Sequence, residues 1–156
     1  MLYLVAELSH DEGMTDLNEA EEEAWCNSER DRVIAYLKGE GLSHGEVGEW
    51  PAWHVAPYVA VWAIESVTKP GWVGWWAISG DLPCDYATCG PERHPREGMR
   101  DIAVRWKHAA ETWARNGSVD WLSIGMPEDR ETLVPLLAAR AEMLLSYASD
   151  DALWEQ

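Results

Sequence analysis

The sequence predicts a small α+β domain, in which a small antiparallel sheet built on a central hairpin is packed by three helices. Two apolar segments, at about residues 58–66 and 72–79, are joined by VTKPG, and a Pro-Gly pair is typical of a turn. Three other segments, at about 16–38, 95–116 and 128–148, indicate helices. The chain of 156 residues is long enough to bury one hydrophobic core.

The domain is expected to span residues 17–156. Residues 1–16 are predicted to be an N-terminal extension that stands apart from it, and Met14 is as suitable a native start as Met1. The short apolar run at 2–8 fits either a strand or an added segment.

The first helix is expected to begin at Thr15 or Asp16. Its first turns are rich in glutamate and Lys38 lies in its last turn, an arrangement that suits the helix dipole. Gly39 and Gly41 are predicted to end it, because glycine commonly follows a helix.

The hairpin is the centre of the predicted sheet. Both faces of segment 58–66 are largely apolar, which is typical of a central strand covered on each side. The preceding residues 40–57, rich in glycine and proline, are predicted to form a loop. Short strands are also expected at about 86–88 and 118–125.

The last two helices complete the domain. Pro95 occupies the favoured first position of the second helix, in which apolar residues recur every three or four positions. Pro135 either restarts the third helix or lies in its first turn. Trp154, near the end of the chain, is able to dock on the domain.

The charge of the chain restricts its partners. Twenty-eight acidic and twelve basic side chains give a formal net charge of −16. Nucleic acid and anionic membrane surfaces are therefore excluded as expected ligands, because both require clustered Lys and Arg. A basic protein partner would instead be steered toward this protein. The chain has eleven Trp and no Phe, so some indoles are expected to line a groove or interface.

A cytoplasmic location is predicted. The three cysteines have no disulfide framework pattern, the N-terminus has no basic region preceding an apolar run, and no apolar segment approaches the length of a membrane span.

Two clusters of polar residues are candidates for a site. Asp81 and Asp85 follow the hairpin in the loop GDLPCDY, and such a pair can act as acid and base, bind a cation or bind an arginine. At the start of the second helix, Arg96 and Arg100 oppose the helix dipole, so each needs a carboxylate or a bound anion. The nearest carboxylates in sequence are those two aspartates, which predicts an ion-pair latch.

No cofactor and no metal are predicted. Cys84, Cys89 and His94 are spaced more widely than the usual zinc ligands, and they lack an evident fourth ligand. A Cys–His nucleophile pair is supported only by chance spacing, and the chain has no glycine-rich phosphate loop or dinucleotide fingerprint.

The motifs WPAWHVAPY, GWWAISGDLPCDY and HPRE, together with AWCNSERDRVIAYLK and SDDALWE, resemble those of an uncharacterised family of small bacterial proteins, a domain of unknown function. The resemblance covers the chain from about Glu22 to its C-terminus. It implies no activity, cofactor or catalytic residue.

Two functional hypotheses follow. The first is a non-enzymatic, acidic, Trp-rich binding protein that neutralises a basic protein partner, as immunity proteins neutralise secreted bacterial toxins. The alternative is a small enzyme or small-ligand binder, whose pocket would be formed by the 50–54 loop, the GDLPCDY loop and the start of the second helix. The candidate binding residues are Trp50, Trp53, His54, Trp76, Asp81, Asp85, Tyr86, His94, Arg96 and Arg100.

Overall fold

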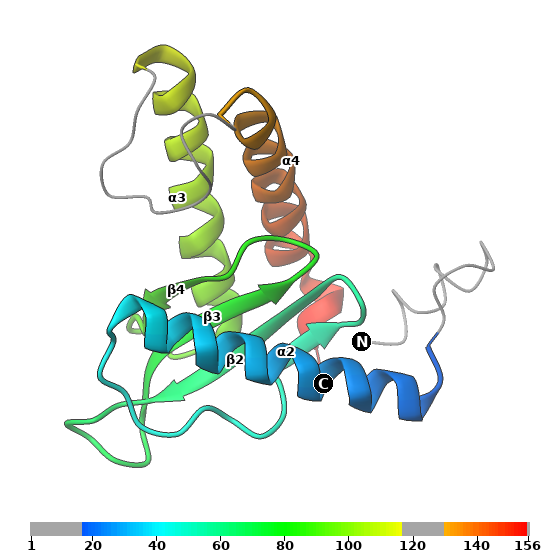
Figure 1. Cartoon of the computed structure of the whole chain (residues 1–156), viewed down its shortest axis with the longest axis vertical. Helices are drawn as coiled ribbons and strands as arrows, with labels where there is room; N and C mark the ends of the chain where they lie inside the picture. Colours follow the sequence, from blue (N-terminus) through cyan, green and yellow to red (C-terminus); the bar gives the residue numbers. More distant parts are fainter. Residues whose placement is uncertain (1–16, 117–129, 156) are drawn as a thin grey trace.

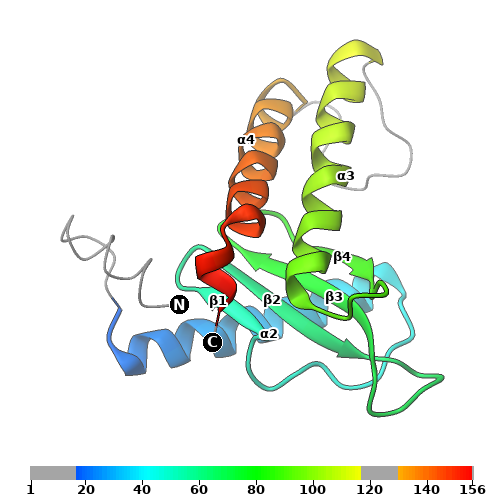
Figure 2. The same ribbon diagram turned by 180° about the vertical axis from the view of Figure 1, so that it is seen from behind.

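The computed structural model describes residues 17–116 and 130–155, which form one four-stranded sheet with helices on both faces (Figures 1 and 2). In chain order the elements are α2 (Glu19–Glu40), β1 (Trp53–Val55), β2 (Val59–Glu65), β3 (Val73–Gly80), β4 (Asp85–Thr88), α3 (Pro95–Asn116), α4 (Arg130–Ser149) and the 3₁₀ helix η2 (Asp151–Trp154). The α+β prediction is confirmed. Among the described residues, no helix has an apolar stretch long enough to cross a membrane.

The sheet is an antiparallel meander in the order β1-β2-β3-β4. The predicted hairpin is its centre, with Val61 of β2 paired to Trp53 on one side and to Ile78 on the other. Most of β2 is buried, as expected for a strand covered on each face. The predicted edge strand near 86–88 is β4, whereas the strand expected at 118–125 lies outside the described residues.

Strand β1 lies within the segment that the sequence predicts as a loop. It contains only three residues, too few for alternation of apolar and polar side chains to be recognised. The chain before it also follows β2, because the amide of Gly45 donates to the Glu65 carbonyl and that of Gly48 donates to the Ala63 carbonyl. An irregular edge therefore extends β1 along the whole of β2.

Helix α2 begins three residues later than predicted. Asn18 caps it in a reciprocal capping box with Glu21, which satisfies two amides that the first turn leaves free. The helix continues through Gly39 and ends where Gly41 adopts a left-handed conformation, with φ of 74°. The helix therefore ends at the glycine that adopts the left-handed conformation, Gly41, and not at Gly39.

Two hydrophobic layers hold the helices to the sheet. On one face, Val33 and Leu37 of α2 pack with Trp62 of β2. On the other face, Trp106 of α3 and Leu144 of α4 share a buried cluster with Ile78 of β3. Both views show α3 and α4 side by side, with ends that project beyond the sheet.

The C-terminal segment closes the second layer. The Trp154 indole stacks on Trp53, with ring centroids 4.4 Å apart, so the predicted docking is confirmed. Pro135 lies at the sixth residue of α4, so it neither restarts the helix nor occupies its first turn.

Candidate functional site

The ten residues predicted to bind a ligand do not surround one pocket. His54 lies on β1 and Asp85 on β4, which are the two outer strands of the sheet. Three strand spacings of about 4.8 Å place these strands about 14 Å apart. The predicted residues are instead distributed among three structural clusters and one exposed aromatic cluster.

Asp85 is the centre of the first structural cluster. Its carboxylate, 8% exposed, accepts a hydrogen bond of 2.7 Å from the Trp106 indole and pairs with Arg105 at 2.7 Å. The Tyr86 amide donates to its other oxygen at 2.8 Å. Burial and the neighbouring Asp85 charge raise the pKa of Tyr36, whose hydroxyl lies 3.4 Å from that oxygen. Asp85 thus holds β4 to α3.

The sequence predicts that Asp81 and Asp85 pair with the arginines at the start of the second helix. This prediction is wrong, because these residues have other partners. Arg96 pairs with the Asp151 carboxylate and donates to the Ala148 carbonyl at 2.5 Å. Asp81 lies 3.5 Å from Arg140 of α4. The start of α3 lies beside the end of α4, so tertiary packing supplies a carboxylate distant in sequence. Arg100 is half-buried on α3.

The third cluster joins the C-terminal segment to the sheet. Trp53 is buried, and its indole donates to the Leu153 carbonyl at 3.0 Å. His94 meets the Trp154 ring edge-on at 5.7 Å. Trp76 is buried in the same hydrophobic layer as Trp53, and within the described residues its indole N–H has no hydrogen-bond partner. Trp53 and Trp76 are therefore core residues.

The exposed aromatic cluster comprises Glu22, Trp25, Trp50 and His54 and is called the Trp50 cluster. His54 Nε2 lies 2.6 Å from the Glu22 carboxylate. The Trp25 ring stacks on the His54 ring, with centroids 6.4 Å apart. The Trp50 ring meets the His54 ring edge-on, with centroids 5.5 Å apart. Trp50 is 47% exposed, the property expected of an indole that contacts a partner. Glu22 and Trp25 were not predicted as site residues, because they lie on α2 and reach His54 only through packing.

An acidic surface adjoins the Trp50 cluster. The arginines of α2 point toward the backbone: Arg30 donates to the carbonyls of residues 47 and 48, and Arg32 donates to those of residues 80 and 82. Arg30 is half-buried, whereas Arg32 and Lys38 remain exposed on the helix. The exposed acids of α2, called here the acidic face, are Glu19, Glu21, Glu23, Asp31 and Glu40.

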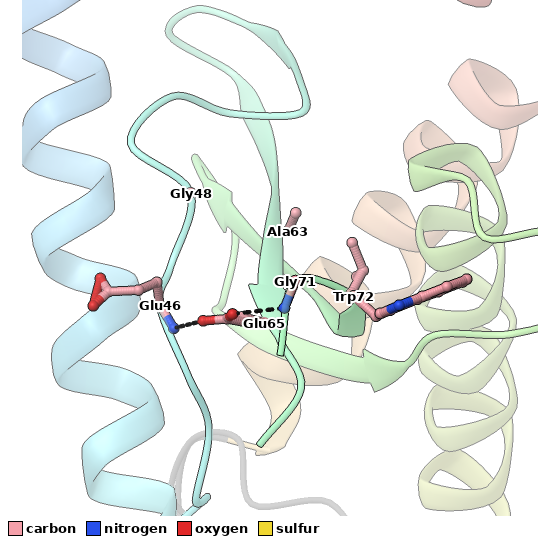
Figure 3. Close-up of a pocket in the computed structure, with 7 residues that line it drawn as sticks. Glu46, Gly48, Ala63, Glu65, Gly71 and Trp72 are labelled. Atoms are coloured by element: carbon pink, nitrogen blue, oxygen red, sulfur yellow. Dashed lines mark hydrogen bonds between the residues drawn. The ribbon is translucent and has the colours of Figure 1, made fainter. Parts of the chain in front are cut away.

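A separate hollow of about 320 Å³ lies beside the end of β2 (Figure 3). Its lining residues are Glu46, Gly48, Ala63, Glu65, Gly71, Trp72 and Val73, none of which was predicted as a site residue. The sequence signal available was weak, because Glu65 is one carboxylate at the end of an otherwise apolar strand. The residues opposite it come from the segment predicted as a loop.

The Glu65 carboxylate is held by the backbone on both sides of the hollow. The amides of Glu46 and Gly71 donate to its two oxygens at 2.9 and 2.8 Å (Figure 3). These hydrogen bonds stabilise the ionised form and lower the pKa of Glu65. The carboxylate is therefore a fixed negative charge at neutral pH.

The cysteines do not gather into a reactive or metal-binding centre in the described part of the chain. Cys26 is a buried residue of α2. Burial, together with the charges of Glu22 and Glu29, raises the pKa of its thiol to about 12. Burial also raises the pKa of Cys84. In residues 17–116 and 130–155, no group of three or more His, Cys, Asp or Glu is arranged to hold a metal ion.

The fold and its surfaces define a small α+β protein in which a meander sheet lies between one helix and a helical pair. The chain belongs to the family described as domain of unknown function (DUF4826), which matches residues 19–154. The family resemblance drawn from the motifs is thus confirmed. Neither the curated proteins nor the solved structures include a match to the chain.

Proposed function

We propose that this protein is a cytoplasmic, non-enzymatic binding protein whose acidic face and Trp50 cluster together engage a basic protein partner. The observation that carries the proposal is the exposed Trp50 beside a helix on which exposed acids outnumber exposed basic residues by five to two. An exposed indole and clustered like charges both make the unbound protein less stable. Their combination on one surface therefore favours a binding role.

The two parts of this surface contribute differently to binding. The acidic face speeds encounter with a cationic partner and makes the association rate sensitive to salt. Trp50 provides apolar contact area, and tryptophan is enriched among the residues that dominate interface energy. His54 meets the Trp50 indole edge-on and is itself paired with Glu22, which limits the side-chain entropy lost on binding.

Immunity proteins that neutralise secreted toxins combine the same features: small size, negative charge and aromatic anchors. A toxin-like basic protein is therefore the partner class that we propose. This part of the proposal rests on similarity of physical profile.

The test is quantitative affinity capture of the tagged protein from its native cells, read by mass spectrometry. Two variants remove the surface: Trp50→Ala, and Glu19→Gln with Glu23→Gln. The matched control neutralises Glu111 and Glu142, which are exposed on α3 and α4. Captures are run at about 0.05 M and about 0.5 M salt, because screening weakens exposed charge attraction.

A basic protein retained by the wild type and the control at low salt, and released at high salt, would support the proposal. Trp50→Ala is expected to weaken its binding at least about tenfold, as loss of an interface anchor does. The proposal fails if no basic protein is retained, or if both surface variants retain it as well as the control does.

A further inference from the structure

We propose that the hollow beside the end of β2 is a binding site for an ammonium or guanidinium group on a short aliphatic stem, as in a lysine or arginine side chain. It lies away from the acidic face of α2, because its floor residue Ala63 belongs to the opposite face of β2 from Trp62. This inference is therefore independent of the proposed partner surface.

The floor of the hollow suits an aliphatic stem. Ala63 and Val73 present methyl groups, and Gly48 and Gly71 add no side chain. A volume of about 320 Å³ is at the lower end of the range of small-molecule sites, about 300–1,000 Å³. The hollow therefore fits one extended side chain or a small amine, and it is too small for a cofactor of nucleotide size.

The charge of the hollow selects a cation. Both oxygens of Glu65 are oriented by backbone amides, yet a carboxylate has about four acceptor positions, so further acceptor capacity remains. The exposed Glu46 contributes its backbone amide, while its side chain points away from Glu65, so Glu65 carries the charge of the hollow (Figure 3). Gly45 allows this arrangement, since a Cβ at that position would lie 2.5 Å from the Glu65 Oε1 atom.

Neighbouring cations do not neutralise this carboxylate. Lys69 and Arg93 lie 4.9 and 4.7 Å from the centroid of the Trp72 ring, and Arg93 also donates to the Val73 carbonyl. Figure 3 shows the Trp72 indole pointing away from Glu65. In the parts of the chain that the structure describes, the Glu65 carboxylate forms no salt bridge. A bound cation would therefore be the charge partner that it lacks.

The test is a titration of the ¹⁵N-labelled protein followed by NMR at the amides of Glu46 and Gly71. Nα-acetyl-lysine amide and Nα-acetyl-arginine amide represent a side chain presented by a polypeptide, and cadaverine and agmatine represent free small cations. Nα-acetyl-norleucine amide has a similar stem without the charge. We expect saturable shifts with the cationic probes and weaker binding, by about threefold to tenfold, for norleucine amide.

Two variants locate the binding. Glu65→Gln removes the charge of the hollow, and Ala63→Leu fills the floor; each is expected to raise the Kd about threefold or more. Glu49→Gln, an exposed neighbour outside the hollow, is the matched control and should bind as the wild type does. Thermal melts confirm that every variant is folded.

Each outcome decides the proposal. Tighter binding of the capped amino acids assigns the hollow to a polypeptide side chain, and tighter binding of the free amines assigns it to a small metabolite; both support the shared chemistry. Absence of saturable shifts, equal binding of norleucine amide, or an unchanged Kd in both Glu65→Gln and Ala63→Leu would overturn it.

Discussion

Replacing Asp85 tests whether the GDLPCDY loop is a structural latch or part of a ligand site. Asp85→Ala removes the acceptor of the Trp106 indole, which is fully buried, and of the Tyr86 amide. The lost pair with Arg105 adds less, because that side chain is 33% exposed and can be solvated.

The magnitude follows from these contacts. A buried donor left without an acceptor costs about 1–3 kcal/mol, and Asp85→Ala leaves two such donors, the Trp106 indole and the Tyr86 amide. We expect Asp85→Ala to lower the free energy of unfolding by about 3–5 kcal/mol. Asp85→Asn keeps one acceptor oxygen, but its side-chain NH2 group would face a donor of the protein. We therefore expect this variant to lower the free energy of unfolding by about 2 kcal/mol.

The assay is urea unfolding followed by circular dichroism. With a slope of about 2 kcal/mol per molar urea, the Asp85→Ala midpoint should fall by about 1.5–2.5 M. The control is Asp81→Asn, whose carboxylate is 73% exposed and 3.5 Å from Arg140, and its effect should stay below about 1 kcal/mol. If Asp85→Ala unfolds at the same urea concentration as this control, the latch interpretation is refuted.

Three further predictions concern backbone conformation and pH. Gly80 has a φ of 133°, and a Cβ there would overlap the Tyr58 carbonyl, so Gly80→Ala should cost at least about 2 kcal/mol in urea unfolding. In contrast, Gly39→Ala adds a methyl group to open space within α2 and should stabilise the protein by about 0.5–1 kcal/mol; loss of stability there would contradict this account. The buried Cys26 thiol has a pKa of about 12, raised from 9.0 by burial, so folding favours its protonated form. Its contribution to stability is complete below about pH 9 and declines as the pH rises toward 12. Wild-type stability should therefore fall more steeply between pH 9 and 10 than that of Cys26→Ala, and parallel curves would contradict the assignment.

The central hairpin was predictable because its determinants are local. Strand β2 is apolar on both faces, the Pro-Gly turn follows directly, and β3 pairs with β2 across that turn. Strand β1 was not predictable in the same way, because three residues with all side chains buried carry no periodic signal. Its pairing partner, which lies later in the chain, decides that it is a strand.

The candidate sites depended more heavily on tertiary structure. The sequence places Arg96 near Asp85, yet the antiparallel packing of α3 and α4 brings it to Asp151 instead. Arg30 and Arg32 look like free surface charges, but both donate to backbone carbonyls of segments distant in sequence. Partners separated by many residues cannot be read from local spacing.

The sequence by itself determined the acidic character of the protein, its family, its three helices and its central hairpin, because composition, motifs and short-range periodicity are local properties of the chain. Only the tertiary structure decided which indoles are exposed and where the hollow lies. Burial of Trp53, exposure of Trp50 and convergence of Glu46 with Glu65 all require segments that are distant in sequence, or on opposite sides of a turn, to pack together.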